Sequence, residues 1–173
     1  MKWVLIVAYA ACVPLANWMI GNVGTCIPDG PCVIDVLPGY SAPSGVLIIG
    51  LALVLRDAIQ MVFGWKWGLY AILIGSIVSY IFASPFIVTA SVVSFLLSEL
   101  CDFAVYTPLA KKRVITAIIA SGVVGSIVDS ASFLLIAFGS LNFIEGQIIG
   151  KIYAVIFATI IIKIIRKGLK YDV

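Results

Sequence analysis

The chain has 173 residues, of which 63% are hydrophobic and 11% charged, whereas soluble globular proteins are about 45 to 50% apolar. Its mean hydropathy is +1.21 and its formal net charge is +3. This composition excludes a soluble globule and indicates an integral membrane protein. The apolar segments are long and continuous rather than alternating, which predicts transmembrane helices and not a barrel.

Six apolar segments are long enough to cross a bilayer as helices, since about 20 helical residues span its hydrocarbon core. We predict them at residues 2–20, 46–63, 67–83, 86–107, 114–138 and 143–165. They fill nearly the whole chain, so residues 1–173 are expected to form a single all-α transmembrane domain. The first segment lacks a clear small-x-small cleavage site and ends in Asn17 and Trp18, so we interpret it as a helix and not as a signal peptide.

Basic residues occur in only one set of the connections between these segments. They are Lys2, Lys66, Lys111, Lys112, Arg113 and, at the end of the chain, Lys163, Arg166, Lys167 and Lys170. The other connections, 21–45, 84–85 and 139–146, contain neither Lys nor Arg. The positive-inside rule therefore predicts that both termini lie in the cytoplasm. The net charge is explained by topology, and no nucleic-acid partner is expected.

The longest outer connection contains two cysteines, Cys26 and Cys32, close to the turn-forming sequence Pro-Asp-Gly-Pro. A turn brings the two sulfur atoms near each other. On an oxidising face they form a disulfide, or they remain unpaired thiols in a cap loop, and the sequence leaves both readings open. The chain has no histidine and no metal-ligand spacing, so we expect neither a metal nor a cofactor.

Charged residues lie inside the predicted spans, where each costs about 2.5 to 3.5 kcal/mol when isolated. They are Arg56, Asp57, Glu99, Asp102, Asp129 and Lys151. Arg56 and Asp57 are neighbours that point about 100° apart on a helix, so we expect their partners on other helices rather than in each other. Two cations face four carboxylates, which leaves two carboxylates without a fixed positive partner.

The polar residues of each span share one helical face. The stripes are Arg56 and Gln60; Glu99, Asp102 and Tyr106; Ser121, Gly125 and Asp129; and Gln147 and Lys151. We expect them to face the bundle interior. One interpretation is a set of interhelical salt bridges that only fix packing. The surplus carboxylates favour the other, a polar substrate cavity at mid-depth that opens to the outer side and is lined there by Asn17, Asp129, Gln147 and Lys151.

Five segments give the chain a resemblance to a known family. They are LANWMIGNVGT, APSGVLIIGLALVLRDAIQ, LLSELCDFAVYTPL, VVGSIVDSASFLLIAFGSL and GQIIGKIYAV. Together they resemble the VUT family, the queuosine precursor transporters, over most of the chain. That family is similar in fold to the substrate-binding subunits of energy-coupling-factor vitamin transporters, which need partner proteins, whereas VUT proteins are thought to act alone. The resemblance implies a multi-pass transporter of the cytoplasmic (inner) membrane.

The resemblance implies that particular residues of this chain occupy the family's characteristic positions. The matching positions are Asp57 and Gly64 in and after the second span, Glu99 and Asp102 in the fourth, Asp129 in the fifth, and Gln147 and Lys151 in the sixth. One position departs, because the common family form has a glutamate where this chain has Met61. The departure indicates a divergent branch of the family.

The ligand that the resemblance implies is a 7-deazaguanine such as preQ0, preQ1 or queuine. A guanine-like edge offers N–H donors to a carboxylate, and its carbonyl accepts from Arg, Lys, Asn or Gln. The residues expected to bind it are Asn17, Arg56, Asp57, Gln60, Glu99, Asp102, Asp129, Gln147 and Lys151.

Other functions remain open at this point. One alternative is a substrate-binding subunit for another small planar vitamin, and a less favoured one is a structural or pore-forming membrane protein. An enzyme is not expected, since the chain has no histidine and no Gly-x-Ser-x-Gly motif. Besides the lipid bilayer and the small-molecule substrate, a homo-oligomeric partner is left open.

Overall fold

The computed structural model describes residues 2–28, 30–83, 85 and 87–169. Within them it contains the helices α1 (Lys2–Asn22), α2 (Val46–Phe63), α3 (Trp65–Phe82), α4 (Val88–Ala110), α5 (Val114–Phe138) and α6 (Ile144–Leu169). Each of the six is long and apolar enough to cross a membrane. The predicted fold class, an all-α bundle of six spanning helices, is therefore confirmed.

The helix bounds differ most from the expected ranges at the C-terminal ends of α4 and α6. Helices α2 and α5 begin and end at the expected residues, while α4 continues to Ala110 and α6 to Leu169. The expected start of the fourth span at Phe86 and the connecting residue Ser84 lie outside the described residues. Gly64 joins α2 to α3 with a φ of 96°, a left-handed conformation that glycine adopts without strain, so the two helices turn sharply with one residue between them.

A small sheet, which the sequence did not predict, occupies the connection between α1 and α2. It consists of β1 (Thr25–Cys26), β2 (Cys32–Leu37) and β3 (Tyr40–Pro43), paired antiparallel in that order. Cys26 lies opposite Cys32 in the β1–β2 register, and the two form a disulfide. Of the two readings that the sequence left open, the structure has the bonded one.

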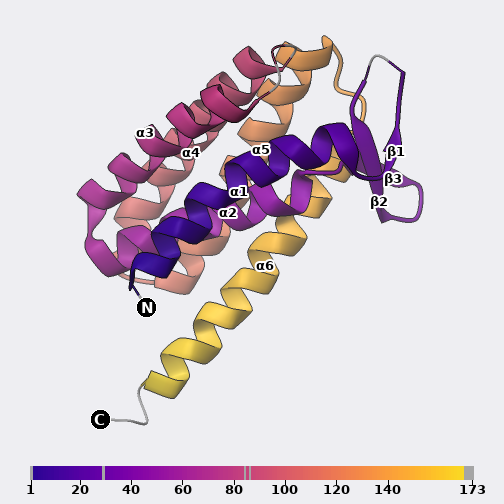
Figure 1. Ribbon diagram of the computed structural model, residues 1–173. Helices are drawn as coiled ribbons and strands as arrows, with labels where there is room; N and C mark the ends of the chain where they lie inside the picture. The colour runs from indigo at the N-terminus through magenta and orange to yellow at the C-terminus, as the bar shows by residue number, and fades with distance from the viewer. Residues whose placement is uncertain (1, 29, 84, 86, 170–173) are drawn as a thin grey trace.

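The sheet lies at one end of the bundle, and α1 starts and α6 ends on the side away from it (Figure 1). The segment that follows β3 is held against α1, because the Ser44 hydroxyl donates a hydrogen bond of 2.6 Å to the Met19 carbonyl. This contact fixes where α2 begins relative to the last turn of α1.

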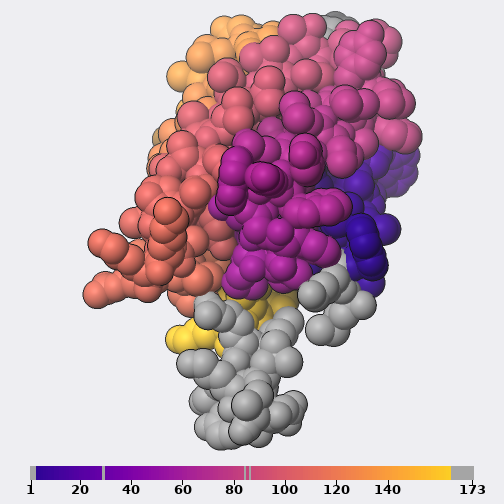
Figure 2. All heavy atoms as spheres, turned by 90° about the vertical axis from the view of Figure 1, so that its left-hand side faces the viewer, coloured from indigo at the N-terminus to yellow at the C-terminus, as the bar shows by residue number. Residues whose placement is uncertain are grey.

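Helix α2 is the central element of the bundle and packs against α1, α3, α5 and α6. Its approach to α6 depends on Gly50, where an added Cβ would lie 2.8 Å from the Lys151 carbonyl oxygen and from the Ala154 Cβ. The two backbones therefore come close enough to place the Lys151 side chain inside the bundle. Helix α3, by contrast, exposes large apolar side chains such as Leu73, Ile77 and Ile81, as expected of a lipid-facing helix. Figure 2 shows the face of the molecule that lies on the left-hand side of Figure 1.

The first prediction concerns orientation in the membrane. Because Lys and Arg gather in the connections opposite the sheet, we expect the sheet to face outward and the α4–α5 turn to face the cytoplasm. In a background with Cys12→Ala and Cys101→Ala, an impermeant thiol reagent applied to intact cells after reduction should label Cys26 or Cys32. An added Lys112→Cys should stay unlabelled until the cells are opened. Labelling of position 112 in intact cells would reverse the assignment.

Candidate functional site

The structure separates the nine residues expected to bind substrate into two groups along the bundle. Near the sheet lies the cavity group: Asn17, Asp129, Gln147 and Lys151. Farther from the sheet, on α2 and α4, lies the arginine cluster: Arg56, Asp57, Gln60, Glu99 and Asp102. The cavity lining includes none of the arginine cluster.

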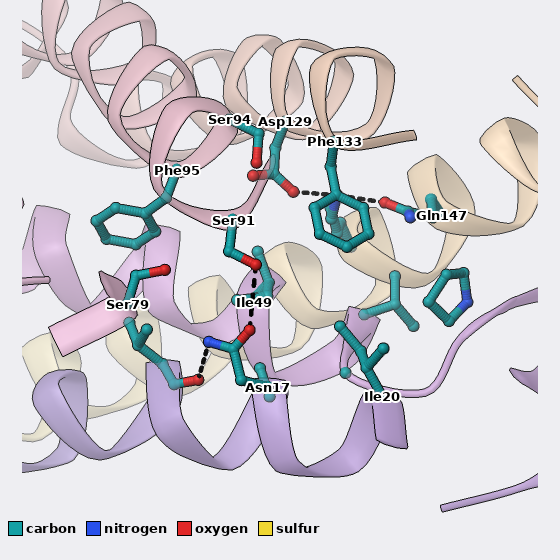
Figure 3. Close-up of a pocket in the computed structure, with 16 residues that line it drawn as sticks. Asn17, Ile20, Ile49, Ser79, Ser91, Ser94, Phe95, Asp129, Phe133 and Gln147 are labelled. Atoms are coloured by element: carbon teal, nitrogen blue, oxygen red, sulfur yellow. Dashed lines mark hydrogen bonds and ion pairs between the residues drawn. The ribbon is translucent and has the colours of Figure 1, made fainter. Parts of the chain in front are cut away.

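The cavity is lined by residues of all six helices and by the end of β3 at Pro43. Its polar lining comes from the cavity group and from Ser79, Ser91 and Ser94, and its apolar walls include Ile20, Ile49, Phe95 and Phe133 (Figure 3). Its volume is about 40 Å³, which accommodates a few water molecules. Typical ligand pockets measure about 300 to 1,000 Å³, so the walls lie close together in this conformation.

Lys151 is the hydrogen-bonding centre of the cavity group. Its Nζ donates to Asp129 Oδ2 at 2.5 Å, to Ser130 Oγ at 2.8 Å and to Gln147 Oε1 at 2.8 Å, which uses all three protons of the ammonium. Gln147 reaches it from one helical turn away on α6, and Asp129 and Ser130 come from α5. The cavity wall therefore carries one positive and one negative group, with no net formal charge.

Asn17 and Ser91 form the opposite side of the cavity, where α1 meets α4. The Asn17 amide donates to the Val13 carbonyl at 3.0 Å, and the Ser91 hydroxyl donates to Asn17 Oδ1 at 3.2 Å (Figure 3). Both groups are polar atoms on an otherwise apolar wall. They can exchange these bonds for bonds to a ligand at little net cost, since each bond of this kind contributes about 1 kcal/mol.

The arginine cluster surrounds one guanidinium with three carboxylates. Arg56 Nε donates to Glu99 Oε2 at 2.9 Å, Nη2 donates to Asp102 Oδ1, and Nη1 donates to Gln60 Oε1 at 3.1 Å. All three carboxylates and Arg56 are at most 1% exposed. The partners that α4 supplies were expected from the sequence.

The expectation that Arg56 and Asp57 would not pair with each other is wrong. Arg56 Nη1 lies 2.8 Å from Asp57 Oδ1. The long, flexible arginine side chain reaches around the helix to its neighbour, so the angle between two Cβ directions does not exclude an ion pair. Asp57 is also held by α5, where the Ser121 hydroxyl donates to Oδ2 at 3.1 Å.

Several buried polar atoms of this region have no hydrogen-bond partner among the described residues. They are Asp57 Oδ1, Glu99 Oε1, Asp102 Oδ2 and the Tyr9 hydroxyl. One guanidinium against three ionised carboxylates gives a formal charge of −2. The two surplus carboxylates counted in the sequence thus lie here and not at the cavity.

Serines that the sequence analysis did not select contribute to the cavity group. Ser91, Ser94 and Ser98 are buried on α4, and the Ser98 hydroxyl lies 3.4 Å from Asp129 Oδ1. These serines continue the face that carries Asp102 at helical spacings of three and four residues, and this periodicity could have revealed them. Met61, the position that departs from the family pattern, is 39% exposed and belongs to neither group.

Comparison with known proteins gives one family. The chain is similar to a family described as "putative vitamin uptake transporter" over residues 76–169, more than half of its length. The matched segment includes Glu99, Asp102, Asp129, Gln147 and Lys151, whereas Asn17, Arg56, Asp57 and Gln60 precede it. No curated protein and no solved structure matches the chain.

The second prediction tests the ion pair at the cavity. Asp129→Asn or Lys151→Met alone leaves its partner as an uncompensated buried charge, so each should lower the free energy of unfolding by about 3 to 5 kcal/mol. The double variant removes both charges and should lose clearly less than the sum of the single losses. Unfolding of the purified protein in detergent measures these differences, with Glu145→Gln, an exposed position of α6, as the control. Strictly additive losses would mean that the two charges do not interact.

Proposed function

Because the chain belongs to the vitamin uptake transporter family and is a multi-pass membrane protein, we propose that it imports a 7-deazaguanine, a precursor of queuosine, across the cytoplasmic (inner) membrane. The cavity is the proposed binding site. The observation that carries the proposal is the placement of a carboxylate, an ammonium and a carboxamide side by side on one wall of that cavity.

This set of groups complements the polar edge of a guanine-like base. Asp129 can accept the two N–H donors of such an edge, while Lys151 or the Gln147 amide donates to the neighbouring ring carbonyl. Phe95 and Phe133 supply the flat apolar surface on which a planar ring packs favourably. A base that binds here replaces the present Lys151–Asp129 and Lys151–Gln147 bonds with its own.

The narrow cavity of this conformation fits the proposed transport cycle. At about 40 Å³ it is too small for a bicyclic base, so the walls must separate before the substrate enters. Alternating access supplies such a step, since one part of a transporter rocks against another around a central site. The described conformation is then the contracted, substrate-free form.

The third prediction is the direct test of uptake. Cells that can neither synthesise nor salvage queuosine precursors should accumulate labelled 7-cyano-7-deazaguanine when they express this protein alone. Gln147→Ala should reduce uptake about tenfold, the effect of one lost buried hydrogen bond worth about 1.4 kcal/mol, and Glu145→Gln on the same helix should not. Absence of uptake would contradict the proposal. Uptake only after co-expression of a coupling protein and ATPases would identify a substrate-binding subunit instead.

The fourth prediction concerns the charge of the substrate. Because Asp129 and Lys151 balance each other, the cavity offers no free carboxylate to an ammonium group, and the neutral nitrile base should compete for uptake better than the aminomethyl base. Gln147→Glu adds a carboxylate 2.8 Å from Lys151 with little change of shape. We expect this variant to shift the relative competition toward the aminomethyl base by about tenfold, equivalent to one charge-assisted bond of about 1.5 kcal/mol. An unchanged ratio would show that the cavity does not read substrate charge.

A further inference from the structure

The arginine cluster has no role in the binding site proposed above. Its charged residues are at most 1% exposed and do not line the cavity. A structural role alone would need one carboxylate for one guanidinium, but three surround Arg56. The two extra carboxylates therefore need another explanation.

Charge and hydrogen bonding both indicate that this cluster takes up protons. A formal charge of −2 inside the membrane is costly, because buried carboxylates need compensation. A protonated carboxyl group also becomes a hydrogen-bond donor, which can satisfy one of the neighbouring oxygens that lack a hydrogen bond at Glu99 and Asp102.

Tyr9 gives an independent indication of the same kind. Its side chain is 1% exposed, and its hydroxyl lies close enough to Glu99 to interact with that carboxylate, although no pair of atoms with full hydrogen-bond geometry includes it. Glu99 Oε1 has no hydrogen bond. The Tyr9 hydroxyl can therefore bond to Glu99 when this carboxyl group changes its protonation or its rotamer. Among the described residues, no group of acids or cysteines is arranged to hold a metal ion.

Polar side chains also lie between the cluster and the cavity and between the cluster and the far end of α4. On the cavity side, Ser98 lies next to Glu99 in the sequence and 3.4 Å from Asp129. On the other side, the Gln60 amide bonds to Arg56 and donates to Thr107 Oγ1 at 2.9 Å, three residues before the end of α4. No hydrogen bond is found between Asp129 and Glu99, so the described network is interrupted at one point.

The titratable and charged groups around this path come from five helices. They are Tyr9 and Cys12 of α1, Arg56 and Asp57 of α2, Glu99, Asp102 and Tyr106 of α4, Asp129 of α5 and Lys151 of α6. Helix α3 presents Gly68 to Gln60, and the nearby Lys66 is exposed.

From this geometry we infer that uptake is coupled to the inward movement of a proton, which the arginine cluster binds. The proton comes from a hydronium ion on the cavity side, whose O–H bond breaks as an O–H bond forms on a carboxylate of the cluster. On the side of Gln60 and Thr107, away from the sheet, that carboxyl O–H bond breaks and the proton forms an O–H bond with a water molecule. One proton is transferred with each base. This inference rests on the proposed uptake function.

The test uses purified protein in proteoliposomes that contain a pH-sensitive dye, with labelled 7-cyano-7-deazaguanine as the probe. An acidic exterior should raise uptake about tenfold over equal pH, and addition of the base should acidify the lumen. Counterflow exchange of the base at equal pH serves as a second measurement, because it needs a folded binding site but no net proton movement. The ratio of pH-driven uptake to exchange is the quantity compared between variants.

Glu99→Gln and Asp57→Asn should lower that ratio at least tenfold, and Glu145→Gln should keep the wild-type ratio. Tyr9→Phe removes only the hydroxyl beside Glu99 and keeps the buried ring, so it should fold normally and still lower the ratio. Three results would overturn proton coupling and leave the uptake function standing. They are exchange without any response to the pH gradient, uptake that follows a sodium gradient instead, and wild-type ratios in the Glu99, Asp57 and Tyr9 variants. Absence of both uptake and exchange in the wild type would overturn the uptake function and, with it, this inference.

Discussion

The burial of the Arg56 guanidinium is the constraint on which the rest of the bundle depends. An arginine with no exposed surface in the middle of a spanning helix is stable only if neighbouring helices satisfy its donors. Glu99 and Asp102 do this from α4, which fixes the register of α4 against α2 to within one residue. The rings of Phe103 and Tyr106 close the cluster, with their centroids 5.8 and 5.7 Å from the arginine Cζ. Ser121 then ties α5 to the same cluster through Asp57, so three helices are positioned around one cation.

Much of the fold follows from the sequence, because long apolar segments in a chain of this composition have few alternatives to spanning helices. The stripes of polar residues also identified which face is buried in α2, α4, α5 and α6. They could not show which stripes meet, because periodicity gives a direction about one helix axis and no distance between axes. In the structure Lys151 of α6 pairs with Asp129 of α5, whereas Arg56 of α2 pairs with Glu99 and Asp102 of α4. The sheet was missed because its strands have two to six residues between glycines and prolines, too short for a clear alternation.

The separation of a neutral cavity from an acidic cluster gives the two groups different chemistry. At the cavity, Lys151 and Asp129 cancel, and their hydrogen bonds can be exchanged for those of a polar, uncharged ligand. In the cluster, the negative charge exceeds the positive, and its charged residues are at most 1% exposed and do not line the cavity. A site that binds an uncharged molecule needs balanced charges, whereas a site that binds a proton needs surplus negative charge. A carboxylate that is fully compensated by cations has little tendency to bind a proton.

Asp129 is the residue through which the two groups can influence each other. It accepts from Lys151 with one oxygen and lies near Ser98 with the other, and its charge acts on Glu99. A base that takes up the Asp129 carboxylate in its own hydrogen bonds spreads that negative charge and releases Lys151 from its present partner. Both changes alter the electrostatic potential at Glu99 and hence the occupancy of the cluster by protons. By thermodynamic linkage such an effect is reciprocal, so in the proposed proton-coupled cycle the protonation of the cluster would in turn change the affinity of the cavity for the base.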